Sequence, residues 1–176
     1  DVAIRNCLFY DNVCYCYYGG GSGVQIIDAE NITFQNCSFT NNQAKQTQNQ
    51  RTPAIELYGS NEEYKNGDGG GIQIGFGCNM NEVDVTFNKC NFSENKAQRH
   101  GGAISIQTLK KVEITDCVFI SNYANYGFST DSNLLEYDTH YHKKLEGRGG
   151  AIYINPAYSY TVNGVYCYNQ NLFMNP

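Results

Sequence analysis

Gly101-Gly102-Ala103-Ile104-Ser-Ile106 is followed by Val112-Glu-Ile114-Thr-Asp-Cys117-Val-Phe119-Ile-Ser-Asn122, and these two phrases decide the fold. The segment just before them ends in the same way, as Phe92-Ser-Glu-Asn95. The sequence therefore returns from Phe92 to Phe119 after 27 residues. A fixed period in the range of about 20 to 50 residues indicates repeats that stack on one another.

Both phrases recur along the whole chain. Copies of the cysteine phrase span residues 2–12, 32–42, 85–95 and 112–122, and a degenerate last copy spans 161–171. In that last copy we align Tyr166 with the cysteine and Tyr168 with the phenylalanine. Copies of the glycine phrase span residues 21–26, 69–74, 101–106 and 149–154. Four to five repeats cover residues 1–176, which we treat as a single domain.

Each phrase alternates apolar and polar residues, which indicates short β-strands. Glycine and asparagine lie at the ends of these strands, where tight turns and positive φ angles are needed. No helical segment separates the phrases, so strands that repeat in one direction must coil upon themselves. We predict an all-β fold, a right-handed parallel β-helix of about four to five coils.

Stacking in register places equivalent residues of successive coils in files. We expect an interior aromatic file of Phe9, Phe39, Phe92, Phe119 and Tyr168. We also expect a ladder of asparagine side chains bonded to one another. Its members are Asn12, Asn42, Asn95, Asn122 and Asn171. We interpret this ladder as structural; the alternative is a polar binding stripe.

Two long insertions interrupt the period. The distance from the phenylalanine to the next glycine phrase is 9 residues after Phe92 but 30 after both Phe39 and Phe119. Two loops, residues 43–68 and 123–148, should therefore leave the same corner of the second and fourth coils. Long excursions on one face are where repeat proteins usually bind partners.

The composition of the chain argues against some classes of function and favours others. The net charge of −5, without a cluster of Lys or Arg, argues against a nucleic-acid partner. No apolar run approaches the roughly 20 residues that span a membrane, so we expect no membrane insertion. Eight cysteines and three sequons indicate an oxidising compartment, at the cell surface or outside the cell. The sequons make Asn31, Asn36 and Asn91 candidate glycosylation sites.

The cysteines divide into two sets. Cys7, Cys37, Cys90 and Cys117 occupy one position in four successive coils, where coil spacing would allow either disulfides or a stack of free thiols. We favour the thiols. Cys14, Cys16, Cys78 and Cys167 lie off this column and are better disulfide candidates. Their spacing does not match a zinc site, and we expect no metal or cofactor.

The pairing of Gly-Gly-Ala-Ile with Phe-x-x-Asn resembles the repeats of the chlamydial polymorphic outer-membrane proteins. The matching residues are the glycine phrases at 101–104 and 149–152 and the turns ending at Asn42, Asn95 and Asn122. The passenger domains of that family are adhesins at a cell surface. The phrases at residues 21–24 and 69–72 only approximate the tetrapeptide, and the motif specifies coil geometry more than function.

We therefore expect a non-catalytic structural or adhesive element, either a segment of an adhesin or a subunit that stacks end to end. Its partners would be copies of itself or adjoining coils, and glycans or cell-surface proteins, which its fifteen tyrosines could contact. The alternative is a polysaccharide lyase or hydrolase of the pectin-lyase type. Such an enzyme needs grouped carboxylates, for which Asp84, Glu113 and Asp116 are the nearest candidates.

Overall fold

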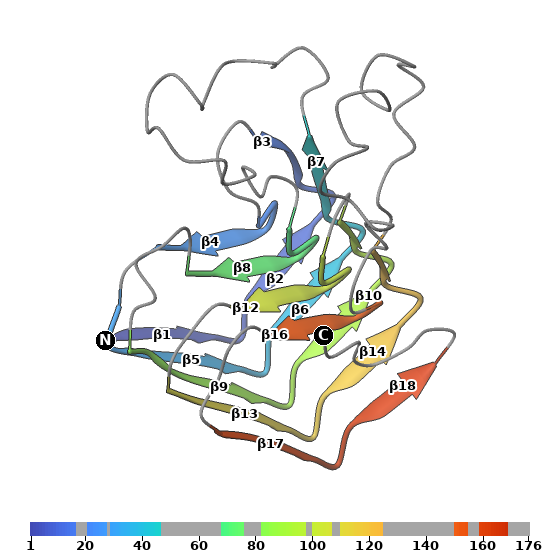
Figure 1. The fold of residues 1–176 in the computed structure, drawn as a ribbon. Coiled ribbons are helices and arrows are strands. Elements are labelled where there is room, and N and C mark those ends of the chain that lie inside the picture. The colour runs from blue at the N-terminus through green and yellow to red at the C-terminus, as the bar shows by residue number, and fades with distance from the viewer. Residues whose placement is uncertain are drawn as a thin grey trace, which may run out of the picture.

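A computed structural model describes residues 1–16, 21–27, 29–46, 68–75, 82–97, 100–106, 110–124, 150–154 and 159–168. Within these ranges every regular element is a β-strand, and all strand pairs are parallel (Figure 1). The strands form four sheets, which we name A to D in the order in which the chain visits them.

Sheets A and B each contain five of the described strands. The strands of sheet A are β1 (Val2–Arg5), β5 (Asn31–Gln35), β9 (Asp84–Asn88), β13 (Lys111–Thr115) and β17 (Ser159–Asn163). Those of sheet B are β2 (Leu8–Tyr10), β6 (Ser38–Thr40), β10 (Asn91–Ser93), β14 (Val118–Ile120) and β18 (Tyr166–Tyr168).

Sheets C and D each contain four of the described strands. The strands of sheet C are β3 (Val13–Cys16), β7 (Gln43–Gln46), β11 (Lys96–Ala97) and β15 (Tyr123–Ala124). Those of sheet D are β4 (Val24–Ile26), β8 (Ile72–Ile74), β12 (Ile104–Ile106) and β16 (Ile152–Ile154).

One strand from each sheet makes one coil. Coil 1 comprises β1 to β4, coil 2 β5 to β8, coil 3 β9 to β12, and coil 4 β13 to β16, while β17 and β18 begin coil 5. Figure 1 shows these coils lying on one another, with β1 and β17 at opposite edges of sheet A. The predicted parallel β-helix of four to five coils is confirmed.

The core lies inside the coils because alternate residues of every strand point inward. Ile32, Phe34 and Phe39 of coil 2 are at most 1% exposed, as are their counterparts in coils 3 and 4. Phenylalanine rings stack in a file, with centroids 4.6 Å apart for Phe9 and Phe39, then 5.1 Å and 4.8 Å onward to Phe92 and Phe119. These separations report the spacing of the coils.

A second aromatic stack, of Phe34 on Phe87 with centroids 5.1 Å apart, lies beside the first. Sequence reasoning placed only one file. The two stacks meet edge to face, at 5.8 Å between Phe34 and Phe39. Offset and edge-to-face contacts of this kind add about 0.5–1.5 kcal/mol each beyond the burial of area.

Sharp corners join the sheets, and most of them use a residue with positive φ. The corner between sheets A and B has φ near +53° at Asn6, Asn36, Lys89 and Asp116. The next corner uses the residue just before each ladder asparagine, for example Glu94 and Ser121. At the glycine corner a Cβ on Gly101 would lie 2.0 Å from the carbonyl oxygen of Ile104, so only glycine fits there.

The register of the last copy differs from the sequence prediction. Cys167, not Tyr168, pairs with Phe119 in the ladder, and Tyr168 pairs with Ile120. Val165 therefore occupies the column position that we assigned to Tyr166. Gly164, with φ +60°, takes the corner position of Asp116 and fixes this register. In the other copies the ladder asparagine stands three residues after the phenylalanine, and in this register that position belongs to Gln170 rather than to Asn171. Both residues lie outside the described part of the chain.

The two predicted loops begin later than predicted. Their first residues belong to strands β7 and β15, which pair with sheet C. Both insertions lead from sheet C to sheet D, so they arise at one corner, as predicted. Residues 47–67 of the first loop and 125–148 of the second lie outside the described part of the chain, whereas Asp68 is described.

Candidate functional site

The asparagine ladder runs through the interior as a continuous hydrogen-bonded file. Asn12 donates its backbone N–H and its Nδ2–H to Oδ1 of Asn42, at 3.1 and 2.8 Å. Asn42 makes the same two bonds to Asn95, and Asn95 makes them to Asn122. Asn42, Asn95 and Asn122 are at most 2% exposed, so their amides serve the ladder rather than a surface stripe.

Each inner rung also bonds backward to the preceding coil. Nδ2 of Asn42 donates to the carbonyl oxygen of Phe9 at 3.0 Å, and Asn95 and Asn122 bond likewise to Phe39 and Phe92. Each of the three junctions between coil 1 and coil 4 thus contains three hydrogen bonds of the ladder. Buried groups this completely paired hold one register, because a slip would leave several of them unsatisfied.

The cysteine column consists of thiols placed alike in four coils. Cys7, Cys37, Cys90 and Cys117 each direct Sγ to the backbone carbonyl two residues earlier, at 3.1 to 3.4 Å. All four are thiols, and only Cys7 is exposed. Burial raises the pKa of Cys37, and the hydrogen bond with Cys117 together with burial raises that of Cys90. These groups fill space as neutral thiols.

The second cysteine set is not brought together among the described residues. Cys14 is a half-buried thiol that stands in register with Ala44, Ala97 and Ala124. The backbone of Cys16 pairs with Gln46, and that of Cys167 with Phe119. Cys78 lies outside the described residues. Disulfide pairing of this set therefore remains a sequence prediction.

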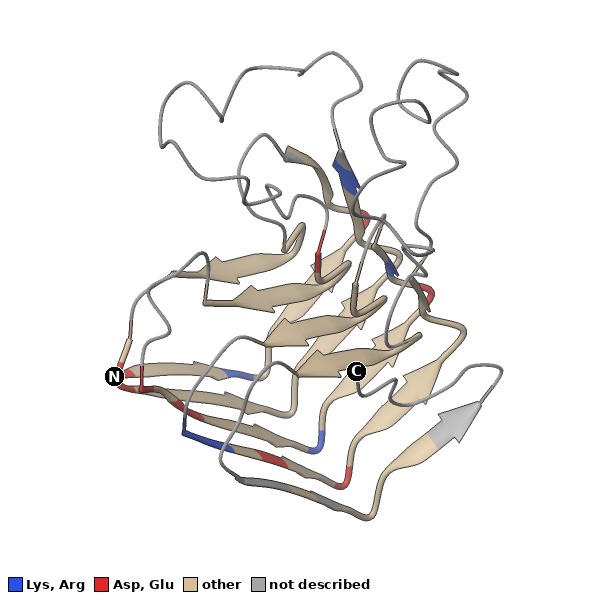
Figure 2. Ribbon diagram, viewed as in Figure 1, with Lys and Arg blue, Asp and Glu red and all other residues tan. Residues whose placement is uncertain are grey.

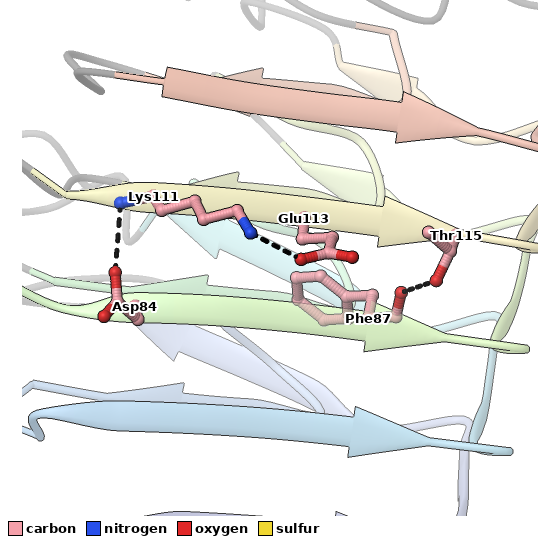
Figure 3. A network of polar contacts seen from close by, with 5 residues as sticks. All are labelled: Asp84, Phe87, Lys111, Glu113 and Thr115. Atoms are coloured by element: carbon pink, nitrogen blue, oxygen red, sulfur yellow. Dashed lines mark hydrogen bonds and ion pairs between the residues drawn. The ribbon is translucent and has the colours of Figure 1, made fainter.

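Two of the three candidate carboxylates lie along the outer face of sheet A, and their contacts are local (Figure 3). Nζ of Lys111 donates to Glu113 at 2.8 Å, and the Lys111 backbone N–H donates to Asp84 at 3.3 Å. The bond to Glu113 raises the pKa of Lys111. Asp116 lies apart, exposed at the corner after β13.

The charged residues elsewhere on the described strands are sparse and mixed in sign (Figure 2). No group of three or more His, Cys, Asp or Glu side chains that could hold a metal ion exists among the described residues. Sheet A therefore offers an exposed ion pair rather than a carboxylate cluster.

A polar group that sequence reasoning missed lies at the start of sheet D. The backbone N–H of His100 donates to the buried carboxylate of Asp68 at 3.2 Å, and the His100 ring stacks on Tyr153 at 4.6 Å. Beside them, the side chains of Gln73 and Ser105 are fully buried. Asp68 and His100 each immediately precede a copy of the glycine phrase, and this shared position is the sequence signal that could have predicted their contact.

Coil 1 differs from its neighbours on its outer face. The outward-pointing residues of its strands β2 and β3, which we name the coil-1 row, are Leu8, Tyr10, Val13 and Tyr15, exposed by 69%, 59%, 46% and 65%. In coil 2 the same positions carry Ser38, Thr40, Gln43 and Lys45. Lys45 approaches the ring of Tyr15 to 5.6 Å. An apolar row in this place is not required by the fold, because coil 2 forms without it.

A comparison with known families agrees with this geometry. The family model described as right-handed beta helix region matches residues 2–138. The chain belongs to the right-handed β-helix family. Searches of curated proteins and of solved structures found no match. The handedness predicted from the sequence is that of the family.

The sequon asparagines of this β-helix all lie at exposed positions. Asn31 begins β5, Asn36 is the positive-φ corner after that strand, and Asn91 begins β10. Side-chain amides of the first two donate at 2.7 Å to Asp1 and Asn6. Among the described residues of the β-helix, no helix is long and apolar enough to cross a membrane.

Proposed function

We propose that this β-helix is a non-catalytic structural and adhesive element of a cell surface or of the extracellular space. It would act as a segment of an adhesin, as the resemblance to chlamydial outer-membrane passenger repeats suggests, or as a subunit that stacks end to end. The fold itself hosts both enzymes and structural proteins, so the proposal rests on the surface residues.

The observation that supports adhesion most strongly is the coil-1 row. Exposed tyrosines beside aliphatic side chains provide flat, amphipathic area of the kind enriched where proteins meet partners. The row borders an outer surface that is polar at the same positions of coils 2 and 3. Coil 4 again carries apolar residues there, namely Val118, Ile120 and Tyr123. Glycans or proteins of a cell surface are the partners we propose for it.

What supports a non-catalytic role is the arrangement of the described carboxylates. Glu113 bonds to Lys111 at the surface, and Asp116 lies at a corner away from both. The specialised files of the fold, of asparagine, phenylalanine and cysteine, all serve stacking. The three sequons supply exposed asparagines for N-linked glycans, and the two long insertions at one corner are a further proposed contact region.

Binding of the immobilised protein to cell surfaces and to a glycan array tests the proposal. We expect the double substitution of Tyr10→Ser and Tyr15→Ser to abolish binding, because it removes both rings of the row. The matched control, Thr86→Ala with Thr161→Ala on the outer face of sheet A, should bind as the wild type does, because it changes two outward residues and leaves the three sequons intact.

The competing function is tested on the same protein with a panel of acidic polysaccharides. Release of cleavage products that is lost with Glu113→Gln would overturn the non-catalytic proposal. Unchanged binding by the Tyr10 and Tyr15 double variant would overturn the assignment of the adhesive surface.

A further inference from the structure

The outer face of sheet D carries a row of side chains that is buried where the other outer faces are not. The first and third residues of each strand in sheet D pack into the core, so the middle residue points outward. In register these middle residues, which we name the sheet-D row, are Gln25, Gln73, Ser105 and Tyr153. Gln73 and Ser105 are fully buried, whereas the outward residues of sheets A, B and C in coils 2 and 3 are half-buried or exposed.

The sheet-D row begins as a ladder of amides. Nε2 of Gln25 donates to Oε1 of Gln73 at 3.3 Å, across the junction between coils 1 and 2. The asparagine ladder has the same polarity, because each of its amides donates to the oxygen of the coil that follows. Since Oε1 of Gln73 is turned to Gln25, Nε2 on the other arm of the same carboxamide is turned away from it. Its hydrogen atoms are directed to the coil-3 side of the row.

This ladder is interrupted at Ser105. The serine side chain is shorter than that of glutamine, so its oxygen lies closer to the strand than a glutamine oxygen would. Within the described part of the chain, Nε2 of Gln73 and Oγ of Ser105 are both buried, and neither has a hydrogen-bond partner. Beyond Ser105 the row continues with Tyr153, whose ring stacks on His100. Two unpaired polar atoms therefore belong to register partners at one junction between coils.

The chemistry of these two atoms selects what can lie between them. Nε2 of Gln73 offers only hydrogen atoms, so it needs an acceptor and does not suit a cation. Oγ of Ser105 can donate or accept. A water molecule accepts from the first and bonds the second in either sense, and buried waters commonly satisfy polar groups of this kind. Without such a molecule, both groups would bear the full cost of desolvation.

We propose that an ordered water molecule bridges Nε2 of Gln73 and Oγ of Ser105. It extends the amide ladder of sheet D from coil 2 to coil 3, on the outside of the coils and at a different corner from the asparagine ladder. Strand β8, which contains Gln73, follows the first long insertion, whereas Asn42 precedes it. The two ladders thus hold the register of coils 2 and 3 on both sides of that insertion. This water site is independent of the proposed adhesive role.

Nuclear Overhauser spectroscopy of the ¹⁵N-labelled protein in water tests the site directly. A long-lived buried water gives a cross-peak to nearby amide protons with the sign of a slowly tumbling contact, whereas a short-lived surface water does not. We expect such a cross-peak from the Nε2 protons of Gln73. The exposed side-chain amide of Gln35 is the internal control and should show none. Absence of the cross-peak at Gln73 would overturn the proposal.

Ser105→Gln tests whether the water occupies the interruption of the row. The longer side chain brings an amide oxygen toward Nε2 of Gln73, as Gln73 does for Gln25, so the folded variant should lose the cross-peak. The matched control is Thr86→Gln, an outward position of coil 3 in sheet A, which should retain it. Persistence of the cross-peak in folded Ser105→Gln would contradict the bridge. The measurement on the wild type decides the proposal even where a variant does not fold.

Discussion

Oδ1 of Asn95 accepts both the backbone N–H and the Nδ2–H of Asn42, at 3.1 and 2.9 Å, inside a file where both side chains are fully buried. This contact joins coil 2 to coil 3 across 53 residues of sequence, a span that includes the long insertion of coil 2. The ladder thus holds the register of coils whose lengths differ widely.

Substitution of Asn95 by alanine should destabilise the fold severely. It removes the acceptor of two donors of Asn42 and the two bonds that Nδ2 of Asn95 makes, and it leaves buried groups unpaired. Each such group costs about 1–3 kcal/mol, so we expect a loss of about 3 kcal/mol or more in urea-induced unfolding. Asn12→Ala, at the half-buried first rung, should cost clearly less. A loss below about 1 kcal/mol for Asn95→Ala would contradict a structural ladder.

The phenylalanine stack should be equally sensitive at its centre. Phe92 lies between Phe39 and Phe119 and is fully buried, so Phe92→Ala should lower the free energy of unfolding by about 3–5 kcal/mol. Leu8→Ala, at an exposed position in the same sheet, should change it by no more than about 0.5 kcal/mol. Similar losses for the two variants would mean that the inward and outward faces are wrongly assigned.

Replacing Lys89 by asparagine should stabilise the protein. Lys89 has φ +53° and is exposed, whereas the same corner of coils 1 and 2 carries Asn6 and Asn36. Asparagine tolerates this left-handed conformation better than lysine, for which it costs about 1–2 kcal/mol. We expect a gain of about 0.5–1 kcal/mol, measured by thermal unfolding. Asn36→Lys, the reverse change one coil earlier, should lower stability, and a gain there would refute the explanation.

The buried thiols should react slowly and make stability depend on pH. A thiol reagent should modify Cys7 rapidly, and Cys37, Cys90 and Cys117 only as fast as the protein opens.

The pKa values of Cys37 and Cys90 are raised in the folded state, so folding favours their protonated form. This stabilisation is present below the unfolded thiol pKa of about 8.5 and is lost as pH rises toward the folded values. In Cys90→Ala the midpoint of thermal unfolding should therefore fall less steeply above that pH than it does in the wild type. The same dependence of the midpoint on pH in both proteins would contradict this prediction.

The sequence is sufficient for most of the fold because its repeats fix strand, turn and register together. Phe39, Phe92 and Phe119 align through phrases that share cysteine and asparagine at constant offsets, so their stacking follows directly. The last copy was misaligned by one residue because Tyr166-Cys167-Tyr168 alternates equally well in either phase. A one-residue slip exchanges the faces of a strand. Gly164, which replaces Asp116 at the positive-φ corner, was the signal that decides the phase.

The candidate surfaces were harder to predict. The tyrosines of the coil-1 row were visible in the sequence, but their exposure depends on the coil being at the edge of the stack. The contact of His100 with Asp68 and Tyr153 joins segments of three different coils by position alone. Asp68 and His100 each precede the first glycine of a glycine phrase, so the stacking of these phrases could have placed them side by side, but the alignment followed only the residues that the copies share.

Electron microscopy of the concentrated, unmodified protein tests the central claim most directly. End-to-end stacking, the structural form of the proposed function, predicts unbranched filaments whose subunits repeat every four to five coils, at about 19–24 Å along the axis for a coil spacing near 4.8 Å. Dispersed single particles at every concentration would contradict it.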